Sequence, residues 1–331
     1  MPSLPDLPTE LLVEIIKCYP SLYVYKADAL VHGVYARQIS GERPLRSLSQ
    51  TCRLLRRIFL PVLWARIYAG PWRKEAKPKN SGGKTVERFM RGIRRTAYVV
   101  PYIQCLSVSM QESTMQNWEL IAEFIRVLRI LPNLRTLTIL GIPSAMMSTF
   151  CASFSEFSFP SVTSLVLPDR LAPVIRHFPN VRTLTNARDV WGDFGTGQQL
   201  LSEAEGRCKQ LRTINNLVPT QTVANYIRQA IPGIQSLSIW QTTRFYGVKE
   251  FPEFMRSIEG MDNLSELTFR YGLWLDTPET PYHLSVLGQI AEAGKRALRT
   301  SKASRRKELC IQYMKPGGGI VQREKQVTVE A

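Results

Sequence analysis

The sequence predicts an α/β protein in which a small all-α N-terminal unit precedes an irregular array of repeats with parallel strands and helices. Three observations support this prediction. An apolar pattern recurs at intervals of 19 to 31 residues, amphipathic helical segments lie between its copies, and two apolar stripes of helical period occupy the first part of the chain. With 331 residues, of which 44% are hydrophobic, the chain is long enough to bury a sizeable core.

The first stripe lies near the N-terminus. Its apolar residues recur at helical spacing: Leu7, Leu11, Leu12, Ile15, Ile16 and Tyr19. Pro8 suits the first turn of a helix, where its missing N–H is not needed, and Glu10 suits the positive end of the helix dipole. The stripe therefore predicts one amphipathic helix.

The second stripe has the same period. Its apolar residues are Leu45, Leu48, Cys52, Leu55 and Phe59. Pro61 is expected to end this helix, and Trp64 follows as a large apolar anchor. A unit this small cannot bury both stripes within itself, so part of its apolar face is expected to meet another protein.

These residues resemble an F-box. The matching segments are Leu4-Pro5-x-Leu7-Pro8-x-Glu10-Leu11-Leu12-x-x-Ile15-Ile16, then Leu45-x-x-Leu48-x-x-x-Cys52-Arg53, then Leu63-Trp64. The resemblance implies a three-helix hook that packs on a Skp-type adaptor, which links it to a cullin and a RING ubiquitin ligase. The docking residues that it implies are Leu7, Pro8, Leu11, Leu12, Ile15, Leu48, Cys52 and Leu55. An insertion at 20–44 separates the two halves where the family has a short turn.

The repeated pattern has an apolar residue, two variable residues, an apolar residue, one variable residue and usually a third apolar residue. Its copies are Ile103/Leu106/Val108, Leu134/Leu137/Ile139, Val162/Leu165/Leu167, Val181/Leu184, Leu211/Ile214, Ile234/Leu237/Ile239 and Leu264/Leu267/Phe269. This period is close to that of leucine-rich repeats, in which each strand, turn and helix buries the face of its neighbour. In two copies, Asn186 and Asn216 stand where the third apolar residue would be. An eighth strand at Leu309/Ile311/Tyr313 is expected to close the array; the rival architecture is a doubly wound α/β domain.

Helices are expected between the strands at Trp118–Ile130, Leu171–Phe178, Thr222–Ile231 and Phe251–Ile258. The predicted domains are therefore an F-box at 1–70 with its insertion at 20–44, a basic linker and connecting helix at 71–96, a repeat domain at 97–314 and a flexible tail at 315–331. Within the linker region, Pro71–Lys84 has a flexible composition, and Val86–Thr96 is expected to form a basic helix.

The net charge of +16 is concentrated in two segments. Arg53–Arg95 carries +11 and Lys295–Lys325 carries +8, so the rest of the chain carries −3. A solvated linker and a loose basic tail explain these charges better than a nucleic-acid site does, and a nucleic-acid partner is not favoured.

The sequence offers no catalytic, metal or cofactor site. The three histidines have no ligand spacing, the six cysteines form no C-x-x-C pair, and Asp193-Phe194-Gly195 lacks the other kinase motifs. The segment Trp191–Gly197 is expected to be a loop. No signal peptide or membrane span is expected, which favours the cytoplasm or the nucleus.

The target-binding candidates lie where two neighbouring strands end. Side chains alternate along a strand, so the positions between the apolar ones are expected to face away from the core. Those positions are Ser107, Thr138, Val166, Thr185, Asn215, Ser238 and Thr268. Beyond them stand residues of the types that anchor protein contacts, with Trp240 and Arg270 expected to be exposed. The candidates are Trp240, Arg244, Tyr246, Arg270 and Tyr271.

The sequence therefore favours a non-enzymatic substrate-recognition adaptor of a ubiquitin ligase. Its N-terminal helices would bind the Skp-type adaptor, and its repeats would bind an unknown target protein. The alternatives are a repeat-based interaction scaffold unconnected to ubiquitin ligation and a nucleic-acid binder that uses the basic segments.

Overall fold

The computed structural model describes residues 7–17, 45–69, 82–110, 118–187, 195–242, 250–272, 281–304, 306–314 and 320–329. The chain forms two compact units, Met1–Ser153 and Phe154–Ala331. The division falls inside the predicted repeat region, so each unit contributes strands of its own. The insertion at 20–44 lies outside the described residues.

The first unit begins with a small helical cluster. It consists of α1 (Thr9–Lys17), a helix at residues 45–51 and α5 (Arg53–Trp64). Its buried core is Leu12, Leu45, Leu55 and Phe59. The two amphipathic stripes of the sequence thus pack against each other, because each offers an apolar face that neither helix can bury alone.

The second stripe forms two helices rather than the single helix that was predicted. Cys52 has an extended backbone and acts as the N-cap of α5, its Sγ accepting a hydrogen bond from the Leu55 N–H at 3.5 Å. Pro61 does not end the helix, which continues to Trp64. The expectation that Pro61 ends the helix was wrong. Leu55 and Phe59 of α5 are buried in the core of the cluster, and this packing outweighs the one backbone hydrogen bond that Pro61 cannot make.

Strands and helices alternate in the rest of the first unit. The elements in order are β1 (Arg66–Ala69), α6 (Gly82–Arg95), η2 (Ala97–Tyr102), β2 (Cys105–Ser109), α7 (Trp118–Arg129), β3 (Thr136–Leu140), η3 (Ser144–Met146) and α8 (Met147–Ala152). The strands β1, β2 and β3 pair in parallel. The predicted basic helix is present but starts earlier, so Gly82, Gly83 and Lys84 belong to α6 and not to a linker. Strand β1 was not predicted.

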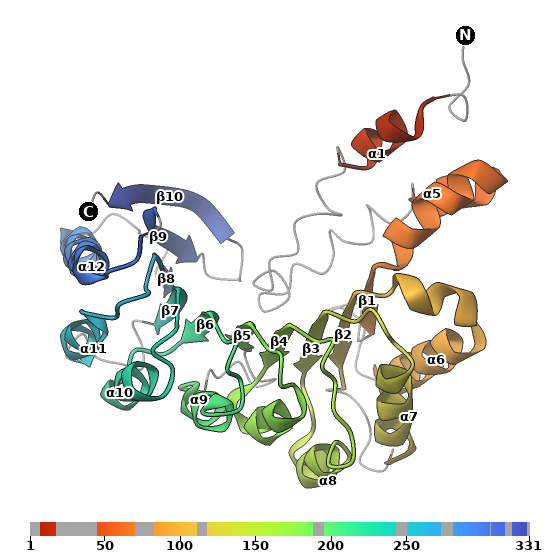
Figure 1. Ribbon diagram of the computed structural model, residues 1–331, viewed down its shortest axis with the longest axis horizontal. Helices are drawn as coiled ribbons and strands as arrows, with labels where there is room; N and C mark the ends of the chain where they lie inside the picture. Colours follow the sequence, from red (N-terminus) through yellow and green to blue (C-terminus); the bar gives the residue numbers. More distant parts are fainter. Residues whose placement is uncertain are drawn as a thin grey trace. The chain divides into compact units, whose positions relative to one another are not determined.

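The second unit continues the alternation. Its elements are β4 (Ser164–Leu167), η4 (Asp169–His177), β5 (Thr183–Asn186), α9 (Gln198–Ala204), β6 (Thr213–Leu217), α10 (Gln221–Ala230), β7 (Ser236–Thr242), α11 (Glu250–Ile258), β8 (Glu266–Gly272), α12 (Pro281–Thr300), β9 (Lys307–Met314) and β10 (Ile320–Val329). Strands β4 to β9 pair in parallel in chain order. Figure 1 shows α9, α10, α11 and α12 in a row along one side of these strands.

The register confirms the predicted α/β architecture, which is consistent with a leucine-rich-repeat-like solenoid. Leu237 of β7 pairs with Ile214 of β6 on one side and with Leu267 of β8 on the other. Leu267 in turn pairs with Leu309 of β9. The eighth strand is therefore present, and the central apolar residue of each repeat stacks on that of the next.

An asparagine three residues before the start of β3, β5 and β8 forms a second repeated contact. The side-chain amide of Asn180 donates to the Pro160 carbonyl at 2.9 Å, and that of Asn263 donates to the Pro232 carbonyl at 3.2 Å. In the first unit Asn133 donates likewise to the Pro101 carbonyl. In these three repeats asparagine thus ties one repeat to the preceding one by satisfying a carbonyl group.

Several expectations for the outer segments need correction. The predicted helix Leu171–Phe178 is the 3-10 helix η4, which contains Pro173; proline cannot supply the N–H of a continuous α-helix. Helices α8, α9 and α12 were not predicted. The helices α7, α10 and α11 match the predicted segments to within one residue.

The C-terminal segment is not a loose tail. Residues Lys295–Thr300 belong to α12, and β10 pairs antiparallel with β9. Polar and charged residues alternate irregularly in β10, and the pairing is interrupted by register shifts on either side of Arg323. This composition resembles a solvated tail, which explains the error.

Candidate functional site

The helical cluster brings together most of the predicted docking residues. Leu12 and Leu55 lie inside its core, while Leu7, Leu48 and Cys52 are half-buried against it. Leu12 and Leu55 therefore hold the helices together rather than form the surface. The side chain of Ile15 lies outside the described residues.

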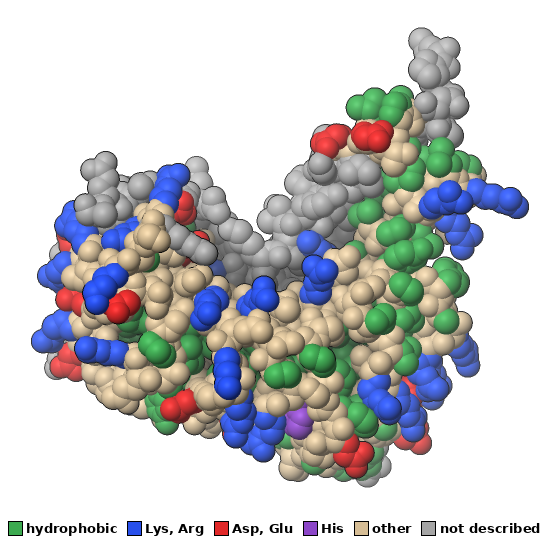
Figure 2. All heavy atoms as spheres, viewed as in Figure 1, with side chains coloured by type: hydrophobic (Ala, Val, Ile, Leu, Met, Phe, Trp, Pro, Cys, Tyr) green, Lys and Arg blue, Asp and Glu red, His purple; other side chains and the backbone are tan. Residues whose placement is uncertain are grey.

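The exposed surface of the cluster includes large apolar side chains. Pro8 is exposed, and Leu11 of α1 has an exposed fraction of 50%. Leu54 of α5, which was not predicted, has an exposed fraction of 42%. Figure 2 shows hydrophobic side chains at the surface over both helices. Leu54 was missed because it lies off the apolar stripe, whose own residues are buried or half-buried in the structure.

Arginines surround Leu54 on α5. Arg53, Arg56 and Arg57 are all exposed, and none makes an ion pair among the residues that the structure describes. In Figure 2 basic side chains gather on the α5 side, whereas acidic ones lie over α1. The surface of the cluster therefore combines exposed leucines with a positively charged border.

Two of the five predicted target residues are buried. Trp240 and Arg270 have exposed fractions of 3% and 5%, so the expectation of exposure was wrong. The two residues face each other in the β7–β8 register, and Arg270 also faces Gln312 of β9. Arg244 and Tyr246 lie outside the described residues. Tyr271 belongs to β8, but its side chain lies outside them too.

Hydrogen bonds fix Arg270 in a buried polar row. Its Nε donates to the Gln312 side-chain oxygen at 3.1 Å, and its Nη1 donates to the side-chain oxygen of Asn216. Arg270 thereby reaches from β8 across β7 to β6. The Asn186 amide extends the row by donating to the Asn216 carbonyl at 3.3 Å. Arg270 is thus held by the strands and contributes to their alignment.

Asn216 holds its place through an uncommon backbone conformation. Its φ is +63°, in the left-handed region that asparagine tolerates better than most residues. The β6–β7 register shifts between Ile214 and Leu217 around it. The asparagine that interrupts the apolar pattern therefore marks an irregularity in strand β6.

The small residues between the apolar positions are mostly covered. Thr138, Thr185 and Ser238 are buried, whereas Thr268 is half-buried. They were expected to face away from the core, and burial does not contradict that. Neighbouring strands lie only about 4.8 Å apart, so paired side chains such as Ser238 and Thr268 shield each other.

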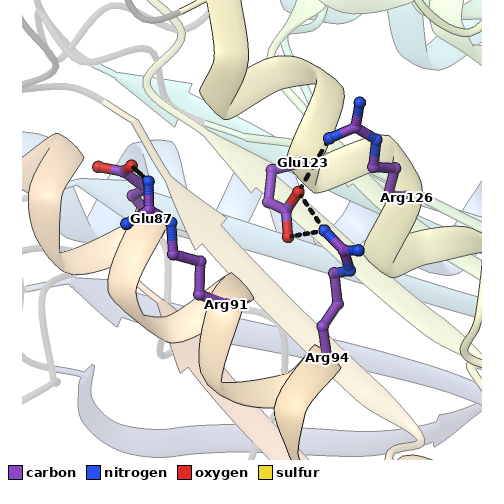
Figure 3. A network of polar contacts seen from close by, with 5 residues as sticks. All are labelled: Glu87, Arg91, Arg94, Glu123 and Arg126. Carbon is purple, nitrogen blue, oxygen red and sulfur yellow. Dashed lines mark hydrogen bonds and ion pairs between the residues drawn. The ribbon is translucent and has the colours of Figure 1, made fainter.

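An ion network joins α6 to α7, as Figure 3 shows. One nitrogen of Arg94 lies 2.8 Å from both carboxylate oxygens of Glu123, and Arg126 donates to the same carboxylate at 3.3 Å. Burial raises the pKa of Glu123, but the two arginines outweigh it and hold the pKa below its ordinary value. On α6 itself Arg91 pairs with Glu87.

Three other groups with a shifted pKa lie within the fold. His177 contacts the Phe157 carbonyl through Nδ1 at 2.9 Å, and burial lowers its pKa. Asp169 accepts hydrogen bonds from the Gly197 and Leu200 N–H groups at the start of α9, with a pKa raised by burial. Burial also raises the pKa of the Cys208 thiol to about 11.

Within the described ranges, no group of three or more His, Cys, Asp and Glu side chains could hold a metal ion. No helix in those ranges is long and apolar enough to cross a membrane. The five cysteines in the same ranges are free thiols.

Compared with known proteins, the chain matches no protein-family model and no curated protein sequence.

Proposed function

We propose that this protein is a non-enzymatic adaptor. Its N-terminal helical cluster docks on a Skp-type adaptor, and its repeats hold a target protein for ubiquitin transfer by a cullin and RING ligase. The contribution to the reaction is proximity, because bringing the target to the ligase raises the effective concentration of the reacting groups.

The observation that carries the proposal is the exposed apolar surface of the cluster. Leu12, Leu45, Leu55 and Phe59 form its own core, yet Leu11 and Leu54 stay about half exposed. Large exposed apolar side chains on neighbouring helices are typical of a surface that a partner covers. The F-box resemblance of these helices supports a Skp-type adaptor as that partner.

The repeats supply the second half of the proposal. Parallel repeats give a continuous face and edge on which a protein partner can bind. Arg270 would support such a site from within the unit, because it bonds to Asn216 of β6 and Gln312 of β9. Arg244, Tyr246 and Tyr271, at or just after the ends of β7 and β8, remain the candidates for direct target contact.

The test is co-purification of the full chain with a co-expressed Skp-type adaptor. The double variant Leu11→Asp/Leu54→Asp places two charges in the apolar contact, and at least a hundredfold loss of affinity is expected because an unpaired buried charge costs several kcal/mol. Both positions are exposed in the free chain, so folding should be unaffected.

The matched control is Ile130→Asp, which likewise replaces an exposed apolar side chain with aspartate, in the same unit but outside the cluster. Ile130 has an exposed fraction of 41%, close to that of Leu54. The Ile130→Asp variant should bind the adaptor with the affinity of the parent chain. Unchanged recovery of the adaptor by the double variant would refute the docking proposal and leave a scaffold without a ligase connection.

A further inference from the structure

Helix α6 presents two different faces. Val86, Met90 and Ile93 are buried in the first unit, with exposed fractions of 2% or less. The opposite face carries Arg88, Arg91 and Arg95, all of them exposed. The three arginines are spaced three and four residues apart, so they lie along one face of the helix over about 10 Å.

Two of these arginines are available for a ligand. Arg94 and Arg126 are occupied by Glu123, and Arg91 is paired with Glu87, as Figure 3 shows. Arg88 and Arg95 make no ion pair or hydrogen bond to any residue in the described part of the chain. The Arg91 pair is exposed and intrahelical, so it is weak and can exchange for a ligand.

The space between the arginines is open. Gly92 is exposed, and a Cβ added there would meet nothing within 4 Å. A ligand can therefore approach the helix backbone between the guanidinium groups. Tyr98, three residues beyond Arg95, has an exposed fraction of 58%, the largest among the large exposed hydrophobic residues of the described ranges.

The character of this face favours nucleic acid over protein. Protein interfaces depend on apolar and aromatic anchors at a centre depleted of charge, and the α6 face has only arginines and a glycine between its ends. Nucleic-acid interfaces are more polar and far more positive. Guanidinium groups bind phosphate oxygens as planar forks, and an exposed tyrosine ring can stack on a base.

We propose that the exposed face of α6 and Tyr98 bind single-stranded nucleic acid. Arg88, Arg91 and Arg95 contact the phosphates, and Tyr98 stacks on a base. This site is distinct from the docking cluster, and the inference does not depend on the proposed adaptor function.

The experiment measures fluorescence anisotropy of labelled single-stranded poly-uridine RNA with the full chain, from about 50 to 200 mM salt. The triple variant Arg88→Gln/Arg91→Gln/Arg95→Gln should bind at least tenfold more weakly. The slope of log K against log salt should become shallower by about 2, because three phosphate contacts are lost at about 0.7 each.

The matched control removes three exposed arginines from the second unit, as Arg212→Gln/Arg228→Gln/Arg256→Gln. It has the same net charge as the test variant, and it should keep the affinity of the parent. An equal loss of RNA affinity in both variants would show that only net charge matters and would contradict the proposed site. Parent-like binding by the α6 variant would overturn it as well.

Two further arms test the ligand class and the tyrosine. Tyr98→Ala should weaken RNA binding about tenfold without changing the salt slope, whereas Tyr98→Phe should bind like the parent. Labelled poly-glutamate should bind more weakly than the RNA. Equal affinity for poly-glutamate, or an inert Tyr98→Ala, would assign the face to acidic protein segments and overturn the nucleic-acid proposal.

Discussion

The helical cluster exposes large apolar side chains, whereas the repeat strands bury polar ones. In the cluster, Leu11 and Leu54 are about half exposed. In the strands of the second unit, Asn216 and Arg270 are almost fully buried. Three short helices cannot cover their own apolar surface, whereas β6 and β8, which contain Asn216 and Arg270, are each flanked by two other strands.

This difference teaches that residue type alone does not locate a binding surface. Trp240 and Arg270 belong to the residue types that most often anchor interfaces, yet the structure uses them inside the second unit. Leucine is less favoured as an anchor, yet two leucines form the exposed surface of the cluster. Their position in the packing decides their role.

The largest expected effect contrasts one leucine from each region. Leu237→Ala removes a fully buried side chain between Leu267 and Ile214, and it should lower the free energy of unfolding by about 2 to 5 kcal/mol. Leu54→Ala should change it by less than about 0.5 kcal/mol. Urea unfolding followed by circular dichroism measures both. Similar losses in the two variants would contradict the comparison.

Substitutions in the buried polar row should have an effect of intermediate size on the free energy of unfolding. Asn216→Ala removes the partner of Arg270 and places alanine at φ +63°, so we expect a loss of about 3 kcal/mol in unfolding free energy. Asn216→Gly removes only the partner, because glycine adopts this φ without strain, and should cost about 1 kcal/mol less. If thermal or urea unfolding gave the two variants equal stability, the backbone argument would fail.

The smallest expected effect on stability comes from removing the charge of Glu123. Because its pKa is lowered in the folded chain, ionised Glu123 stabilises the fold above the ordinary pKa of 4.5, and this contribution is lost as pH falls through the folded value. Glu123→Gln should cost about 1 kcal/mol at pH 7, since both arginines are about half exposed. The difference from the parent should shrink as pH falls below 4.5. A difference independent of pH would assign the effect to packing.

Much of the fold could be predicted because the repeated apolar residues are the buried ones. All seven first positions, such as Val181 and Ile234, are almost completely buried, and an apolar period reports burial directly. Strand β1 escaped prediction because Arg66–Ala69 is only four residues long and lacks the repeat pattern. Helix α12 was missed because its basic end was interpreted as tail.

The candidate sites could be predicted only in part. The predicted docking residues follow from the helical period, but the break between the two helices at Cys52, whose Sγ caps α5, was not predicted. The predicted exposure of Arg270 was wrong because its guanidinium group bonds to Asn216 and Gln312 on other strands. Such contacts between distant residues leave no local trace in the sequence.

The most direct test of the docking proposal is hydrogen–deuterium exchange of the full chain with and without a purified Skp-type adaptor. Binding should slow exchange of the backbone amides in α1 and α5 around Leu11 and Leu54, while amides in β5 to β8 exchange at unchanged rates. Slower exchange confined to the repeats, or unchanged exchange throughout the chain at saturating adaptor, would contradict the proposal that the N-terminal cluster is the docking surface.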